Sequence, residues 1–282
     1  METKKVLAND YEITYIDRGN GVTLVFVHGS LSDYRSWGAQ IEFFSQRYRT
    51  IALSLRHCYP ELWNGEGGRF SIQQHADDLA VFIKNLNTGP VHIVGHSRGG
   101  SVVLKMITDH PYLYRTAVLA DPAPFNNMLS MNSEETDEIE KRNKNVRKAL
   151  DQINKGDIDK GLEIFTDVVS SFGAWKKLFE TAKQIRRDNV WSLKSLTLDA
   201  KEPFSCEDAK KIIKPILLIT GENSPRIYGM MHGKLENSLM NYEKTIISNA
   251  SHGMHRDNPE AFNAVVYNFL DKNRDPPPKN CN

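Results

Sequence analysis

The most informative stretch of this chain reads Val91-His92-Ile93-Val94-Gly95-His96-Ser97-Arg98-Gly99-Gly100-Ser101-Val102-Val103-Leu104-Lys105-Met106. It predicts a short apolar strand followed directly by a helix, with Ser97 on the turn between them. A serine on such a turn takes strained backbone angles, and the small residues Gly95, Gly99 and Gly100 let the chain pass. The turn also places Ser97 beside the free N–H groups at the start of the helix, which stabilise negative charge. We therefore predict a catalytic serine at position 97 rather than a plain glycine-rich turn.

Apolar runs of strand length alternate with helical patterns along much of the chain. The expected strands are residues 11–17, 22–27, 50–55, 91–94, 116–120, 215–220 and 243–247, and helical patterns follow several of them, at 37–48, 71–86 and 98–110. Strands that alternate with helices form a mainly parallel sheet. The sequence therefore predicts an α/β fold, with helices on both faces of a mostly parallel sheet.

The alternation stops between residues 124 and 214, where strand patterns vanish and charged helical stretches take over. We predict an inserted helical cap or lid over 124–214, and a core formed by residues 1–123 and 215–274. The charge runs 141–144 and 183–187 are typical of solvated helix faces. The tail 275–282 contains three consecutive prolines, cannot continue a helix and is expected to be disordered.

Composition and charge narrow the class of partner. The chain has 282 residues, and 36 Lys and Arg against 35 Asp and Glu give a formal net charge of +1. Such a balance supplies no overall field for nucleic acid or an acidic membrane. No apolar run approaches the roughly 20 residues of a membrane span, and the first residues are polar. The three cysteines are scattered. We therefore expect a cytoplasmic protein with a small-molecule substrate and incidental thiols.

A candidate base for Ser97 lies near the end of the chain. His252 follows the last expected strand, in Asn249-Ala250-Ser251-His252-Gly253-Met254-His255. A loop in this position reaches the carboxyl edge of an α/β sheet, where such folds place their sites. The chain order serine, acid, histidine also matches the motif around Ser97. We predict that His252 is the general base, and the alternative is a loop histidine with a structural hydrogen bond.

Backbone amides are the expected oxyanion donors. His28-Gly29-Ser30 follows the strand 22–27, so the Ser30 N–H can point back at a substrate carbonyl together with the N–H of Arg98. The alternative is a turn that only leaves the strand. The spaced histidine pairs of the chain lack a carboxylate cluster to complete a coordination set. We expect neither a metal site nor a cofactor.

These motifs together resemble the α/β-hydrolase fold family, over about residues 10–272. Within that resemblance, the segments 56–60, 120–123 and 250–255 are similar to a group of uncharacterised bacterial-type hydrolases. The resemblance implies a serine hydrolase with a helical cap after the sixth strand, and it identifies no substrate.

The acid of the expected triad departs from the usual family pattern. Family members usually carry an aspartate after the seventh strand, whereas this chain reads Gly221-Glu222-Asn223-Ser224 there. A subset of the family carries the acid after the sixth strand, where Asp121 stands. The resemblance therefore favours Asp121 as the acid, with Glu222, or the absence of a fixed acid, as alternatives.

These residues predict a hydrolase that cleaves a small carboxylic ester or lactone through an acyl-enzyme. The same groups serve amide, carbon–carbon or perhydrolytic cleavage, because a triad alone does not select the bond. A serine at position 97 argues against haloalkane dehalogenase or epoxide hydrolase activity, for which the resemblance implies an aspartate. A non-catalytic small-molecule receptor of the same fold is the second class of function.

Overall fold

An eight-stranded sheet runs through the protein. The computed structural model describes residues 2–129, 132–195 and 204–274, so the expectation for the tail 275–282 lies outside the described residues. The strand order is β1-β2-β4-β3-β5-β6-β7-β8; the β1–β2 and β2–β4 pairs are antiparallel, and the other pairs are parallel. The strands are β1 (Lys4–Ala8), β2 (Tyr11–Arg18), β3 (Thr23–Val27), β4 (Arg49–Leu53), β5 (Val91–His96), β6 (Tyr114–Ala120), β7 (Ile216–Gly221) and β8 (Tyr242–Ile247). The predicted mostly parallel α/β sheet is confirmed.

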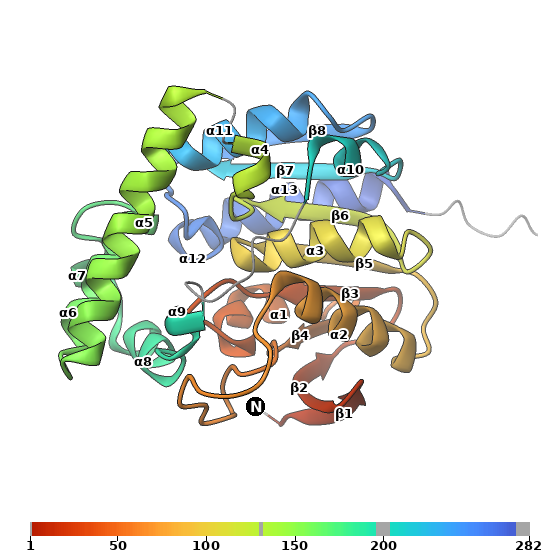
Figure 1. Cartoon of the computed structure of the whole chain (residues 1–282). Helices are drawn as coiled ribbons and strands as arrows, with labels where there is room; N and C mark the ends of the chain where they lie inside the picture. Colours follow the sequence, from red (N-terminus) through yellow and green to blue (C-terminus); the bar gives the residue numbers. More distant parts are fainter. Residues whose placement is uncertain (1, 130–131, 196–203, 275–282) are drawn as a thin grey trace, which may run out of the picture.

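Helices cover both faces of the sheet because successive strand residues point to opposite sides (Figure 1). In β3, Leu24 and Phe26 join an apolar cluster with α1 and α13, whereas Val25 and Val27 join a second cluster with α2, α3 and α11. These helices are α1 (Gly38–Phe44), α13 (Pro259–Lys272), α2 (Ile72–Asn85), α3 (Arg98–Asp109) and α11 (Arg226–Glu236). Apolar strands buried on both sides hold the carboxyl ends of β3, β5 and β6 in fixed relative positions.

The described residues between β6 and β7 are mainly helical and lie mostly beside the sheet (Figure 1). Its helices are α4 (Asn126–Leu129), α5 (Ser133–Asn154), α6 (Ile158–Val169), α7 (Ala174–Lys177), α8 (Glu180–Asp188), α9 (Ser192–Ser195) and α10 (Cys206–Lys210). Val146, Leu150 and Ile153 of α5 pack with Leu162 and other apolar residues of α6, α7 and α9 in a third cluster, separate from the two that flank the sheet. We refer to residues 133–195 as the α5–α9 segment.

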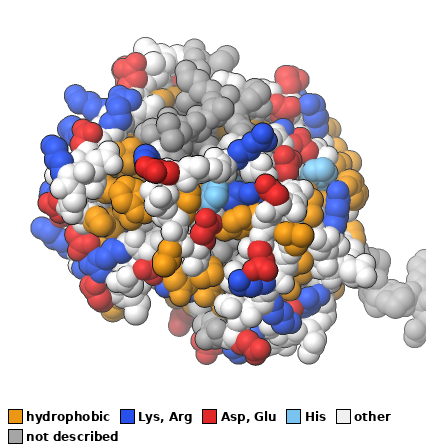
Figure 2. All heavy atoms as spheres, turned by 60° about the horizontal axis from the view of Figure 1, so that its bottom comes forward, with side chains coloured by type: hydrophobic (Ala, Val, Ile, Leu, Met, Phe, Trp, Pro, Cys, Tyr) orange, Lys and Arg blue, Asp and Glu red, His pale blue; other side chains and the backbone are white. Residues whose placement is uncertain are grey.

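Charges of both signs are interspersed over the face shown in Figure 2. Many charged side chains among the described residues pair locally, as Lys5 does with Glu12 and Lys4 with Asp17. No helix among the described residues is long and apolar enough to cross a membrane.

Candidate active site

Ser97 occupies a strained turn between β5 and α3. Its φ of 53° and ψ of −124° lie outside the regions that ordinary residues prefer. The turn holds because the Ser97 N–H donates to the Ala120 carbonyl at 2.9 Å. A side chain at position 99 is excluded, since a Cβ there would lie 2.4 Å from the Val27 carbonyl oxygen. The structure thus has the strand-to-helix turn predicted around Ser97, with the backbone of β3 packed directly beneath it.

The loop after β3 passes against Ser97. A Cβ at Gly29 would lie 2.9 Å from the Ser97 Cβ, which shows how closely the two backbones approach. His28 anchors this loop: its Nε2 accepts from the Leu55 N–H at 2.9 Å, which leaves Nδ1 protonated to donate to the Gly29 carbonyl at 2.8 Å. Ser30 follows directly and lines the same cavity as Ser97 and Arg98.

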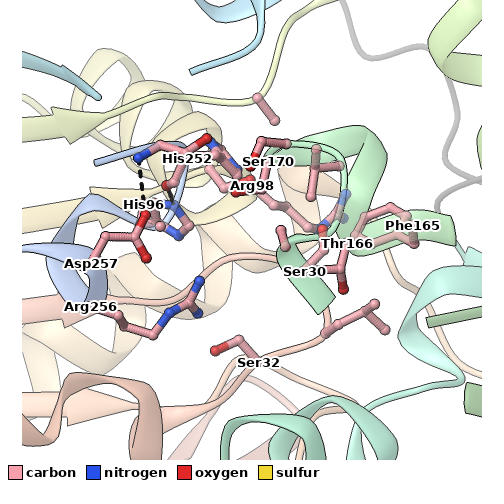
Figure 3. Close-up of a pocket in the computed structure, with 18 of the residues that line it drawn as sticks. Ser30, Ser32, His96, Arg98, Phe165, Thr166, Ser170, His252, Arg256 and Asp257 are labelled. Atoms are coloured by element: carbon pink, nitrogen blue, oxygen red, sulfur yellow. Dashed lines mark hydrogen bonds between the residues drawn. The ribbon is translucent and has the colours of Figure 1, made fainter. Parts of the chain in front are cut away.

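His252 lies on the loop between β8 and α12 (Met254–Asp257), and it also lines that cavity. Its Nδ1 is 3.2 Å from Asp121 Oδ2, and its carbonyl oxygen is 2.7 Å from His96 Nε2 (Figure 3). The Tyr228 ring stacks on the imidazole at a centroid distance of 4.1 Å. Three neighbours therefore fix the position and plane of the His252 ring. Burial lowers the pKa of His252, and nearby arginines lower it further.

Asp121 ends β6 and is fully buried. Its N–H donates to the Ile219 carbonyl of β7 at 2.9 Å, and its Oδ2 accepts from the Ser224 hydroxyl at 2.6 Å. Burial raises the pKa of Asp121, while the Ser224 hydrogen bond and the His232 ring, whose Nε2 is 3.7 Å from Oδ1, favour the carboxylate. The loop after β7 therefore contributes a hydroxyl that orients a carboxylate from β6.

Glu222, the alternative acid, lies apart from His252. Its side chain is exposed and accepts the Asn249 N–H at 2.8 Å. The structure brings Asp121, and not Glu222, into contact with the imidazole. At position 224 the sequence indicated only that the usual aspartate is missing. It gave no indication that Tyr228 and His232, both on α11, contact His252 and Asp121.

The residues around Ser97 and His252 enclose a cavity of about 660 Å³ (Figure 3). Ser30, Arg98 and His96 line it on the side of the sheet, and Phe165 and Thr166 of α6 line it opposite. Five of the six predicted site residues thus lie at or directly behind one cavity: Ser30, Ser97, Arg98, Asp121 and His252. Among the described residues, no group of three His, Cys, Asp or Glu side chains is arranged to hold a metal ion.

Comparison with known proteins shows the family. The model of the alpha/beta hydrolase family matches residues 24–265. The chain is 23% identical over 273 residues to the 2-(acetamidomethylene)succinate hydrolase of Mesorhizobium japonicum, covering 90% of each protein. Its fold is similar to that of bromoperoxidase from Bacillus anthracis (TM-score 0.79, 21% identity, 96% of this chain and 100% of that one). It is also similar to an N-acyl homoserine lactone degrading enzyme (TM-score 0.74, 20% identity, 94% and 100%). The chain belongs to the alpha/beta hydrolase family.

Proposed function

We propose that this protein is a serine hydrolase that cleaves a small carboxylic ester or lactone through an acyl-enzyme intermediate. The observation that carries the proposal is the contact between His252 Nδ1 and the buried Asp121 carboxylate, at the wall of the cavity that Ser97 also lines. With Nδ1–H donated to Asp121, the Nε2 of His252 is the free acceptor of a proton.

In the first half of this reaction, His252 Nε2 takes the proton of the Ser97 hydroxyl as its oxygen attacks the substrate carbonyl carbon. The Asp121 carboxylate stabilises the resulting imidazolium. The backbone N–H groups of Ser30 and Arg98 donate to the oxyanion, and each such donor typically contributes about 2.7–4 kcal/mol. The tetrahedral intermediate then breaks its carbon–oxygen bond, and the leaving alcohol takes the proton from His252.

In the second half, His252 removes a proton from a water molecule that attacks the acyl carbon. The second tetrahedral intermediate expels the Ser97 oxygen, which recovers its proton from His252 and releases the carboxylic acid. The chain's own residues supply the nucleophile of the first half and the base, acid and oxyanion donors of both halves, whereas water is the nucleophile of the second half. A small molecule is the expected partner. We further propose that residues 124–214 serve as the cap that sets the size of the acyl group.

The choice of an ester or lactone is supported by the named chemistry of relatives, because the serine by itself does not select the bond. One structural neighbour degrades N-acyl homoserine lactones and one sequence relative is a hydrolase of a substituted succinate. Perhydrolytic cleavage is an alternative, because one structural neighbour is a bromoperoxidase. Amide and carbon–carbon cleavage are two further alternatives. A small-molecule receptor would keep the cavity without an activated serine.

A fluorophosphonate probe tests the activated serine directly, because such reagents trap it covalently. We expect one labelled site, at Ser97 in a peptide map, and no labelling of the Ser97→Ala variant. Ser171→Ala is the matched control, since Ser171 lines the same cavity and should leave labelling unchanged. Labelling of the Ser97→Ala variant, or an unlabelled wild-type protein, would reject the proposal and favour the receptor.

A further inference from the structure

The cavity around Ser97 is rich in positive charge. Arg142 of α5, Arg186 of α8 and Arg256 of α12 all line it. These helices are far apart in sequence and lie on the same side of the protein, beyond the strand ends (Figure 1). Among the described residues, Asp257 is the single acidic side chain in the lining.

These three arginines lack acidic partners inside the part of the chain that the structure describes. Arg186 donates to the Ala182 carbonyl at 3.0 Å, and the buried Nε atoms of Arg142 and Arg256 have no acceptor. Asp257 forms no ion pair with Arg256, and it accepts the Ser251 N–H at 3.0 Å instead. Figure 3 shows the Arg256 side chain directed into the cavity.

Other arginines of the chain form ion pairs with carboxylates. Arg187 adjoins Arg186 and pairs with Asp159 at 2.7 Å, and Arg35 pairs with Asp33 at 2.7 Å. Arg56 pairs with the buried Asp78, also at 2.7 Å. The chain thus supplies carboxylates to arginines elsewhere and leaves three without them around one cavity.

A half-buried guanidinium without a counter-charge is unfavourable, because it loses water and gains no partner. Burial lowers the pKa of Arg186 and Arg256, although a guanidinium stays charged at neutral pH. An anion that enters the cavity would remove this cost. Guanidinium groups bind the planar or branched oxygens of carboxylates and phosphates with charge-assisted hydrogen bonds.

We propose that Arg142, Arg186 and Arg256 form a subsite for an oxyanion carried by the substrate, a carboxylate or a phosphate-type group. The inference rests on the proposed function and deepens it: the ester that Ser97 cleaves is an anionic one. The arginines neutralise the second group of the substrate while the Ser30 and Arg98 amides hold the reacting carbonyl.

Three matched esters test the subsite. They are methyl hydrogen adipate, which carries a carboxylate; dimethyl adipate, which is neutral and similar in length; and methyl 5-phosphonopentanoate. We expect kcat/KM of the wild-type protein to be at least about 10-fold higher for an anionic ester than for dimethyl adipate, since charge-assisted hydrogen bonds stabilise its binding. A higher value for the phosphonate would assign the subsite to a phosphate-type group, and a higher value for the carboxylate to a carboxylate.

Charge removal identifies the residues. Arg256→Gln and Arg142→Gln should each lower the preference for the anionic ester by roughly 10- to 100-fold. The Lys variants should recover part of it, because lysine keeps the charge and loses the planar fork. Lys144→Gln is the matched control: it removes one charge from an exposed side chain of α5 that does not line this cavity, and the preference should not change.

Binding separates this inference from the proposed reaction. Ser97→Ala should bind the preferred anionic ester in a calorimetric titration, and the added Arg256→Gln change should weaken that binding by roughly 10-fold or more. Arginine-dependent binding by a protein that hydrolyses no ester would reject the proposed function and uphold the subsite. Equal kcat/KM for anionic and neutral esters would overturn the subsite. So would an affinity for the anionic ester that is the same with and without the Arg256→Gln change.

Discussion

The two walls of the cavity are built in opposite ways. On the side of the sheet, the groups proposed to do the chemistry are held by protein partners: Ser224 donates to Asp121, Asp121 contacts His252, and His96 contacts the His252 carbonyl. On the far side lie Arg142 and Arg186; these two and Arg256 of α12 have no acidic partner among the described residues. Protein contacts fix the catalytic geometry in advance, whereas the charges of the opposite wall are left for a ligand to satisfy.

The two walls also differ in the apolar residues on which they pack. The sheet wall rests on strand ends whose residues are buried on both faces, as the fully buried Val27 and Ala120 are. The α5–α9 segment has its own apolar cluster, which Leu31 of the β3 loop joins from the core. The sheet wall therefore depends on the sheet core, and the positions of Arg142 and Arg186 depend on how the helices of the α5–α9 segment pack together. Arg256 lies outside that segment, on α12.

Between the two walls, the largest effect is expected from Asp121→Asn. An asparagine no longer stabilises the charged form of His252 and permits the wrong tautomer, so ester kcat should fall by a factor on the order of 10⁴. Steady-state kinetics on dimethyl adipate measures this fall, because that ester does not depend on the arginine wall. Glu222→Gln is the matched control, and it should change kcat less than about 3-fold. A larger loss in Glu222→Gln than in Asp121→Asn, with both variants folded by circular dichroism, would move the acid to the later loop.

A smaller loss is expected for Ser224→Ala. This change removes the 2.6 Å hydrogen bond to Asp121 Oδ2 and leaves a buried carboxylate with one donor fewer. Hydrogen bonds to charged groups contribute about 1.5–3 kcal/mol, so kcat should fall roughly 10-fold or somewhat more.

Two further variants separate orientation of Asp121 from a general loss of stability. Ser224→Thr keeps the hydroxyl and should restore much of the activity. Ser238→Ala removes a buried hydroxyl that donates to the Lys234 carbonyl at 2.8 Å, and it should not affect kcat. If Ser224→Ala is as active as the wild-type protein, the hydroxyl has no role in orienting Asp121.

The sheet wall could be predicted well from the sequence, because its features are local. Continuous apolar runs of strand length, the glycines around Ser97 and the loops at strand ends all leave patterns in adjacent residues. Asp121 followed from the absence of an aspartate in the Gly221–Ser224 turn together with the family resemblance. Its contact with His252 agrees with that interpretation, and the catalytic role itself stays a prediction.

The arginine wall could not be predicted in this way. The charge runs 141–144 and 183–187 indicated solvated helix faces, which holds for the exposed Lys141 and Lys144 but not for Arg142 and Arg186. Which residue of such a run faces a cavity depends on how each helix is rotated against its neighbours. That rotation is set by the tertiary packing of α5 and α8, so the local sequence does not predict it.

The smallest expected effect is a shift of the pH profile that links the two walls. Burial, followed by the positive charges of Arg256, Arg142 and Arg186, lowers the pKa of His252. Only neutral His252 accepts a proton, so activity is lost as pH falls through its pKa, and the acid limb of kcat/KM should lie below pH 6.5, the ordinary value. Arg256→Gln removes one repelling charge and should raise this pKa, which moves the acid limb to higher pH by roughly half a unit.

Dimethyl adipate is the substrate of choice because its own charge does not change with pH, and Lys144→Gln should leave the limb in place. An acid limb that moves to lower pH in Arg256→Gln would mean that the arginine wall does not act on His252 through its charge.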